Sequence, residues 1–146
     1  MAVNQKQYVI FKVENDEYGA DINKVTIIER MLNITRVPKT PQYIKGVINL
    51  RGDVIPVMDL RTRFSLPGKE ADDNTRIIII DINGISYGII VDSVVEVLQF
   101  DETSIESVSG FTSNVNLDYI SGVAKNNDRL ITLLNLEKLI SELTNA

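Results

Sequence analysis

The chain has 146 residues, of which 44% are hydrophobic and 24% charged, and its formal net charge is −5 at pH 7. These values are typical of one globular domain, or of two very small ones that share an interface, and they exclude a disordered chain. The absence of cysteine and histidine excludes disulfides, thiolate nucleophiles and imidazole, which is the usual general base and metal ligand.

The sequence indicates neither a signal peptide nor a membrane span. Residues 1–7 lack the apolar core of a signal peptide, and no apolar run approaches the roughly 18 residues that cross a bilayer. We therefore expect a cytoplasmic protein that does not insert directly into a membrane. The negative net charge and the scattered basic residues also disfavour nucleic acid as a partner.

Two predicted strands open the chain, at residues 8–13 and 18–22, and the polar residues 14–17 form the turn between them. The stretch 47–60 contains two apolar, β-branched runs that flank Arg51-Gly52-Asp53. Because Gly adopts the positive φ of a tight turn without strain, we expect a β-hairpin that raises Arg51 to the surface. The alternative is an ordinary solvated turn.

The polar segment 65–76 connects this half of the chain to the next, which again begins with a strand, at residues 77–82. Asn83-Gly84 is the strongest short hairpin signal, and the following strand covers residues 87–91. Positions 77–80 are all Ile, so this strand is expected to be covered on both faces.

A helix is predicted near the C-terminus, after Asn135 as its N-cap. Its apolar stripe has helical spacing and consists of Leu136, Leu139, Ile140 and Leu143. We expect this helix to pack on the β-structure, and a helix that binds a partner is the alternative.

The two halves are related by an internal repeat. Tyr18-Gly19 in the first half recurs as Tyr87-Gly88 in the second. Residues 43–47 (Tyr-Ile-Lys-Gly-Val) recur as residues 119–123 (Tyr-Ile-Ser-Gly-Val), at a slightly larger offset along the chain. We infer a duplicated unit of about 70 residues. Short strands with close turn signals then predict two small barrels or sandwiches that share an interface.

The motifs at residues 18–25, 43–52 and 54–61 resemble those of the CheW family of bacterial chemotaxis coupling proteins, and the likeness continues through residues 87–94 and 130–139. It therefore covers nearly the whole chain. The Asn-Leu-Arg-Gly hairpin followed by an Ile-Pro-Val strand is specific to this family.

The resemblance implies one mainly β, CheW-like domain over residues 1–146, made of two packed, five-stranded Src-homology-3-like barrels and a short C-terminal helix. We expect the first barrel at about residues 14–70 and the second at residues 1–13 with 71–146. Whether strands are exchanged between the barrels stays open.

The resemblance also implies a non-enzymatic scaffold, with no cofactor and no metal, that couples methyl-accepting chemoreceptors to the histidine kinase CheA. Such a chain is a monomer in solution and assembles in receptor arrays. One of its barrels contacts the regulatory domain of the kinase, and an apolar groove binds the cytoplasmic tip of the receptor. By position, the receptor-binding residues are Val25, Ile28, Gly46, Val47, Asn49, Leu50, Arg51 and Gly52.

Within this set, the aliphatic side chains would receive those of the receptor, with the protein core as the alternative, and Arg51 would donate hydrogen bonds at the rim. Gly46 and Gly52 would permit close approach of the receptor backbone. On the kinase side the resemblance indicates Phe111, an aromatic residue in a polar loop, as a ring-closing contact. A further kinase contact is expected on an edge strand that contains Ile90, Val91 and Asp92.

Two other classes of function remain open at this point. An enzyme would need convergent carboxylates such as Asp21, Asp53 and Asp92, and nothing in their spacing brings them together. An oligonucleotide-binding barrel would need a basic, aromatic-lined face, which the acidic composition disfavours. Within the family, the kinase pathway could control surface motility or gene expression instead of swimming.

Overall fold

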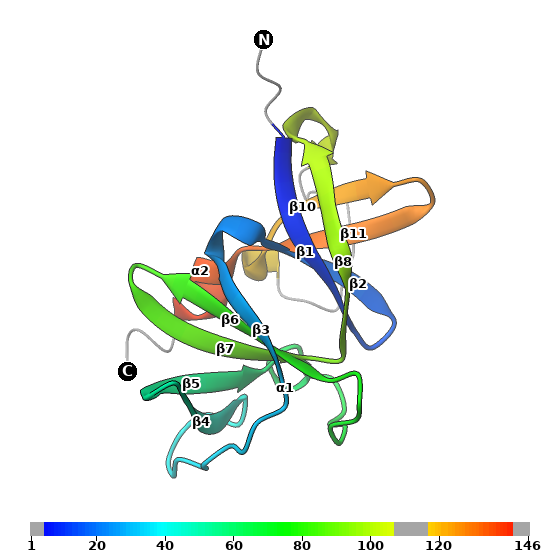
Figure 1. Cartoon of the computed structure of the whole chain (residues 1–146). Helices are drawn as coiled ribbons and strands as arrows, with labels where there is room; N and C mark the ends of the chain where they lie inside the picture. Colours follow the sequence, from blue (N-terminus) through cyan, green and yellow to red (C-terminus); the bar gives the residue numbers. More distant parts are fainter. Residues whose placement is uncertain (1–4, 107–116, 142–146) are drawn as a thin grey trace.

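The computed structural model describes residues 5–106 and 117–141 and is built mainly of β-strands, which form one sheet of six strands and one of five. In Figure 1 the six-stranded sheet occupies the upper part of the molecule and the five-stranded sheet the lower part. The mainly β, two-module architecture predicted from the sequence is confirmed, with a short sixth strand added to one of the modules.

The six-stranded sheet has the strand order β8-β1-β2-β11-β10-β9, and only the pair β2 and β11 is parallel. Its strands are β1 (Gln5–Val13), β2 (Asp16–Asp21), β8 (Ser93–Asp101), β9 (Ile105–Glu106), β10 (Ile120–Asn126) and β11 (Arg129–Leu134). The 3-10 turn η2 (Glu102–Ser104) joins β8 to β9, and η3 (Leu117–Tyr119) precedes β10.

The five-stranded sheet has the strand order β3-β6-β7-β5-β4, and only the pair β5 and β7 is parallel. Its strands are β3 (Val25–Arg30), β4 (Ile44–Leu50), β5 (Asp53–Asp59), β6 (Arg76–Ile82) and β7 (Ile85–Val91). The 3-10 turn η1 (Ile22–Lys24) leads from β2 to β3. The short helices α1 (Leu60–Arg63) and α2 (Leu136–Leu139) follow β5 and β11.

Each sheet combines the first hairpin of one repeat with later strands of the other repeat. In the five-stranded sheet Val57 pairs with Gly88, and in the six-stranded sheet Leu133 pairs with Gly19. The two pairs are equivalent under the repeat, because Val57 corresponds to Leu133 and Gly88 to Gly19. The exchange that the sequence left open is therefore a reciprocal exchange of the hairpins β1–β2 and β6–β7.

The sheets group the strands differently from the barrel boundaries expected from the sequence. The strand β2 lies in the six-stranded sheet, although its residues fell within the expected first barrel. Likewise β6 and β7 lie in the five-stranded sheet, although their residues fell within the expected second barrel. The physical reason is that both repeats carry the same apolar pattern, so a hairpin from either repeat fits either sheet.

The main hydrophobic core lies between the two sheets and contains Phe11 and Tyr18 from one sheet and Ile78 and Tyr87 from the other. The neighbouring residues of β6, Ile77 and Ile79, belong instead to a separate cluster of the five-stranded sheet. The prediction that residues 77–80 are covered on both faces is thus confirmed, since all four side chains are at most 2% exposed.

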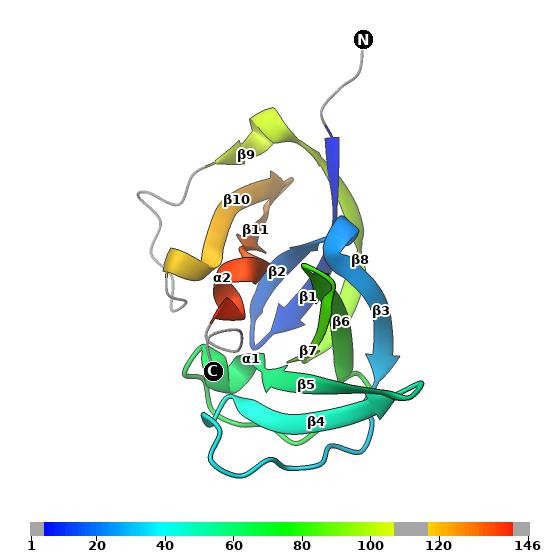
Figure 2. The same cartoon turned by 90° about the vertical axis from the view of Figure 1, so that its left-hand side faces the viewer.

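The helix α2 packs on the β-structure as predicted. Leu136, Leu139 and Ile140 are buried in the core between the sheets, and Figure 2 shows α2 between β10–β11 and β5. The fourth residue of the predicted stripe, Leu143, lies outside the described residues. In the part of the chain that the structure describes, no helix has the length and apolar character to span a membrane.

Candidate functional site

The hairpin β4–β5 has the geometry that its sequence predicted. Arg51 and Gly52 adopt φ values of 53° and 90°, and the pair Leu50–Asp53 closes the turn. The side-chain oxygen of Asn49 accepts a hydrogen bond from the Gly52 amide at 3.1 Å, which fixes the turn from within. The Arg51 side chain is exposed and makes no ion pair with any described residue. It is therefore available at the hairpin tip.

Two other residues of the expected receptor site, Gly46 and Val47, are engaged within the chain itself. Thr35 forms two backbone hydrogen bonds with Val47, of 2.8 and 2.9 Å. A Cβ atom on Gly46 would lie 2.1 Å from the carbonyl oxygen of Thr35. The close approach that we expected Gly46 to offer a receptor is thus already made by the chain's own connection between β3 and β4.

The aliphatic residues of the expected receptor site have different environments. Val25 is half-buried and packs against the core between the sheets, while Leu50 packs against the cluster of the five-stranded sheet. Ile28 is 41% exposed on β3, and Val54, which the sequence analysis did not select, is 66% exposed beside the hairpin tip. The strands β3 and β4 are the two ends of the strand order, so the set divides between two strand edges.

The prediction that Ile90, Val91 and Asp92 belong to an edge strand is wrong. The strand β7 lies between β6 and β5 in the middle of its sheet, because the parallel pairing with β5 covers its second edge. Val91 is 1% exposed, and Ile90 packs against the cluster of the five-stranded sheet. The nearly continuous apolar run of β7 was the signal for such a central strand. Phe111 lies outside the described residues.

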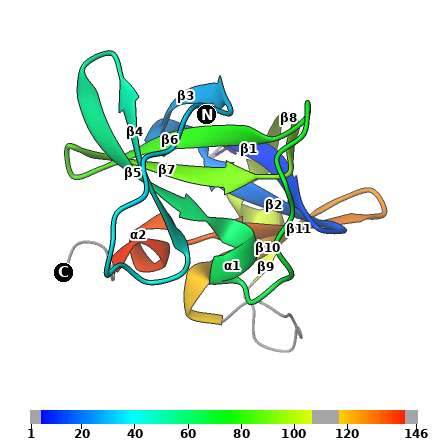
Figure 3. The same ribbon diagram turned by 90° about the horizontal axis from the view of Figure 1, so that it is seen from below.

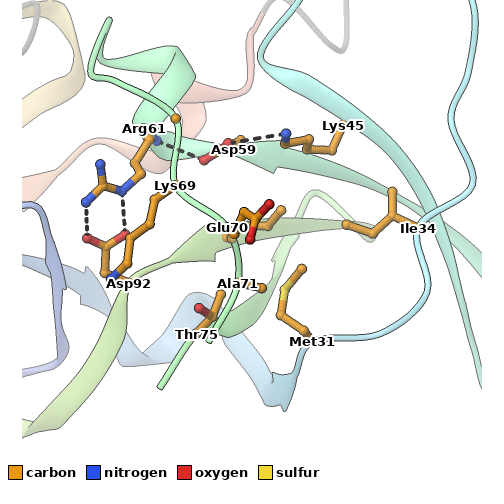
Figure 4. Close-up of a pocket in the computed structure, with 12 residues that line it drawn as sticks. Met31, Ile34, Lys45, Asp59, Arg61, Lys69, Glu70, Ala71, Thr75 and Asp92 are labelled. Carbon is orange, nitrogen blue, oxygen red and sulfur yellow. Dashed lines mark hydrogen bonds and ion pairs between the residues drawn. The ribbon is translucent and has the colours of Figure 1, made fainter. Parts of the chain in front are cut away.

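Asp92, the third residue of that set, holds the two sheets together. The guanidinium of Arg61 donates to both carboxylate oxygens of Asp92, at 2.8 and 2.7 Å, and to Glu14 in the β1–β2 turn at 2.6 Å. Figure 4 shows the paired contact between Arg61 and Asp92. Burial raises the pKa of Asp92, but hydrogen bonds from Arg61 and from the Glu14 amide outweigh it and lower the pKa below its ordinary value.

A cavity of about 510 Å³ lies beside this ion pair, and its wall includes Asp59, Glu70 and Asp92. Asp92 is held ionised by Arg61, and the Asp59 carboxylate caps α1 by accepting the Arg61 amide at 3.0 Å. Of the other acids considered for an enzyme, Asp21 lines a different pocket and Asp53 starts β5 at the hairpin. The three acids named for catalysis are therefore not brought together.

Arg63 joins the repeats at the seam between the sheets. Its guanidinium lies 4.3 Å from the ring centre of Tyr43 and 4.6 Å from that of Tyr119, the two tyrosines that the repeat relates. Seen from below, α1, α2 and η3 lie next to one another at this seam (Figure 3). Such a cation–π stack fixes how the two modules are oriented.

Four of the six exposed large aliphatic side chains among the described residues form two pairs related by the repeat, which the sequence analysis missed. Ile28 on β3 and Val97 on β8 are repeat equivalents and are 41% and 49% exposed. Val54 and Leu130 correspond in the same way and are 66% and 52% exposed. Applying the repeat offsets to solvent-facing positions of the strands would have found them. Both modules thus present equivalent apolar positions to solvent.

These features define a class of protein. A two-module β-structure with exposed aliphatic residues on its strands and a free arginine at a hairpin tip is typical of a protein-interaction module. No group of three or more carboxylates suited to a metal ion occurs among the residues that the structure describes.

Comparison with known proteins identifies the family. A model of the CheW-like domain matches residues 7–144. Chemotaxis protein CheW of Bacillus subtilis (strain 168) is 38% identical over 138 residues, which cover 94% of this chain and 88% of that protein. Chemotaxis protein CheW of Klebsiella aerogenes is 37% identical over 136 residues, which cover 93% and 82%.

Among solved structures, the scaffolding protein TtCheW from Thermoanaerobacter tengcongensis matches with a TM-score of 0.86 at 38% identity, over 92% of each chain. The chain belongs to the CheW family.

Proposed function

We propose that this chain is a non-enzymatic scaffold of bacterial chemotaxis that couples the cytoplasmic tip of chemoreceptors to the histidine kinase CheA. It works in the cytoplasm and is recruited to receptor arrays at the membrane. It holds receptor and kinase in a fixed relative orientation, so that small receptor movements bias the activity of the kinase.

The observation that carries this proposal is the exposed Arg51 at the tip of a rigid hairpin, in a chain that matches the CheW-like domain over residues 7–144. The turn around Arg51 is fixed by Asn49, so the guanidinium starts from a defined position. A forked, charge-assisted set of hydrogen bonds from this arginine would fix the receptor at the rim of the site. Ile28 supplies a second class of contact, an exposed aliphatic side chain.

On the kinase side, we propose that Phe111 contacts the kinase and that the buried Val91 does not contact it directly. We assign the regulatory domain of the kinase to an exposed strand edge of the scaffold, where backbone groups and aliphatic side chains are accessible. The exposed Val97 on β8, the end strand of its sheet, has this character.

The experiment is reconstitution of receptor-dependent kinase autophosphorylation with Arg51→Asn. Asn tolerates the positive φ of position 51, so the variant removes the guanidinium while keeping the turn. We expect the free energy of unfolding to change by no more than about 0.5 kcal/mol. Receptor-dependent activation should fall about tenfold, which corresponds to the loss of one charge-assisted hydrogen bond.

The matched variant Arg51→Lys keeps the charge and loses the forked geometry, so we expect an intermediate effect. Normal coupling by Arg51→Asn would exclude Arg51 from the receptor contact, and the absence of any coupling by the unmodified protein would overturn the proposed function.

A second variant concerns the kinase side. Phe111→Ser should leave receptor activation of dilute complexes intact while impairing array order.

A further inference from the structure

The basic residues of this acidic chain are concentrated in one segment. Residues 30–52 carry five of the fifteen Lys and Arg residues and none of the twenty Asp and Glu residues. The five are all exposed and consist of Arg30, Arg36, Lys39, Lys45 and Arg51. The segment comprises the connection from β3 to β4, the strand β4 and the hairpin tip. It therefore forms a positive region on a molecule whose net charge is negative.

Three of these cations line a single pocket of about 500 Å³ in the β3–β4 connection. We call it the basic pocket, and its cations are Arg36, Lys39 and Lys45. The rest of its wall is largely apolar and includes Ile34, Val37, Pro38, Pro41 and Ile44. None of the described residues that line it is a carboxylate. The pocket thus combines positive charge with space for an apolar side chain.

The basic pocket is a built feature of the fold. Figure 2 shows the β3–β4 connection running along β4 on the side away from β5. Two backbone hydrogen bonds between Thr35 and Val47 fasten it there, and the Thr40 hydroxyl donates to the Val37 carbonyl at 3.0 Å. The pocket walls are therefore positioned before any partner arrives, which lowers the entropic cost of binding.

Two of the three cations of the basic pocket, Arg36 and Lys39, have no carboxylate partner among the described residues, and the third has a weak one. The carboxylate of Asp59 lies 3.9 Å from the Lys45 ammonium, but it already caps α1 and is 8% exposed (Figure 4). Arg36 makes no ion pair with a described residue, and the same holds for Lys39 within the described ranges 5–106 and 117–141. Positive charge without a carboxylate partner is left for a ligand to complement.

We propose that the basic pocket docks an acidic segment of a partner protein, which places one aliphatic side chain between the apolar walls. The cations set the charge of the partner, and the apolar walls distinguish a protein segment from a simple anion. An extended nucleic acid fits poorly, because its phosphates would continue beyond these cations over a chain of net charge −5, whereas a short acidic segment can end within the pocket. The inference rests on the proposed function only for the identity of the partner, which we assign to the same signalling assembly.

The test measures binding of a fluorescein-labelled peptide of Glu and Leu to the full chain by fluorescence anisotropy. The variant Arg36→Gln, Lys39→Gln, Lys45→Gln should bind about tenfold more weakly, since three exposed ion pairs are each worth a factor of about two to five. The difference should shrink at high ionic strength, because salt screens interactions between exposed charges. Kinase and receptor fragments are then titrated against both proteins, and one of the two should show the same loss.

The matched control, Lys12→Gln, Lys125→Gln, Lys138→Gln, removes three exposed cations from other surfaces and changes the net charge equally. Equal binding by the two triple variants would overturn the proposal. Displacement of the peptide by inorganic phosphate, or equally tight binding of a Glu and Ser peptide, would identify a simple anion site and would also overturn it. Because the peptide assay uses no kinase or receptor, its outcome is independent of whether the proposed coupling function holds.

Discussion

At the scale of single residues, the fold itself requires glycine at position 46, whether or not a partner binds there. Its φ of 149° is a conformation that L side chains rarely adopt, and the Thr35 backbone fills the space of a Cβ. At its repeat equivalent, Gly122, a Cβ would meet the side chain of Ile105 at 2.6 Å, although the φ of Gly122 is not positive. Both glycines allow an additional segment to pair closely with a strand.

We therefore expect Gly46→Ala to lower the free energy of unfolding by about 2 kcal/mol or more, because it adds both a backbone clash and a strained φ. Urea denaturation followed by circular dichroism measures this change. The matched variant is Gly68→Ala, because a Cβ at Gly68 meets no atom within 4 Å. That variant should remain within about 0.5 kcal/mol of the unmodified chain. Equal midpoints for the two variants would contradict the packing role of Gly46.

At the scale of elements, the Arg61 ion cluster connects three segments that are distant in the sequence. Arg61 lies on α1, Asp92 between β7 and β8, and Glu14 in the β1–β2 turn. Arg61 also donates to the Pro67 carbonyl at 2.8 Å, so it fixes the start of the inter-repeat connection. The cluster thereby holds the exchanged hairpin β1–β2 against the module that contains α1.

Asp92→Asn should lower the free energy of unfolding at pH 7 by about 1–3 kcal/mol, because it leaves the partly buried Arg61 with less compensation. The folded-state pKa of Asp92 is lowered, so its contribution is present above the unfolded-state pKa and is lost as the pH falls through the folded-state pKa. The difference in stability between the unmodified chain and the variant should therefore begin to shrink near about pH 4 and disappear only below the lowered folded-state pKa of Asp92.

The matched control for Asp92 is Glu102→Gln, which removes an exposed ion pair of 3.8 Å with Lys6. Exposed pairs contribute little, so we expect a change below about 0.5 kcal/mol at every pH. A difference between Asp92→Asn and the unmodified chain that persists unchanged to pH 3 would show that packing, not charge, sets the role of Asp92.

The turns and the repeat could be predicted from residue types and their spacing, whereas the order of the strands in each sheet could not. Arg51-Gly52 and Asn83-Gly84 both adopt positive φ, as their residue types require. The sequence could not place β7 in the middle of its sheet, because an apolar run specifies coverage but not the neighbouring strand. The contact between Arg61 and Asp92 could not be predicted for the same reason, since it depends on how the strands are arranged in the folded chain.

At the scale of the whole molecule, the exchange makes neither module independent. Each sheet takes strands from both repeats, and the main core lies between the sheets and contains side chains from each of them. The parallel pairs β5–β7 and β2–β11 are where the repeats meet inside each sheet. A scaffold that holds its partners in a fixed orientation requires its two modules to form one rigid body. Modules that moved independently would absorb a partner's movement instead of transmitting it.

The two sheets are therefore expected to unfold in one cooperative transition. Ile48→Ala removes a core side chain of the five-stranded sheet and Ile131→Ala one of the six-stranded sheet, and both residues are at most 1% exposed. Each variant should cost about 2–5 kcal/mol, and either one should lower the protection of slowly exchanging amides equally in both sheets. Hydrogen exchange followed by NMR resolves β6 and β11 separately. Protection lost only in the sheet that carries the substitution would show that the modules unfold independently, and the hairpin exchange would then not couple them.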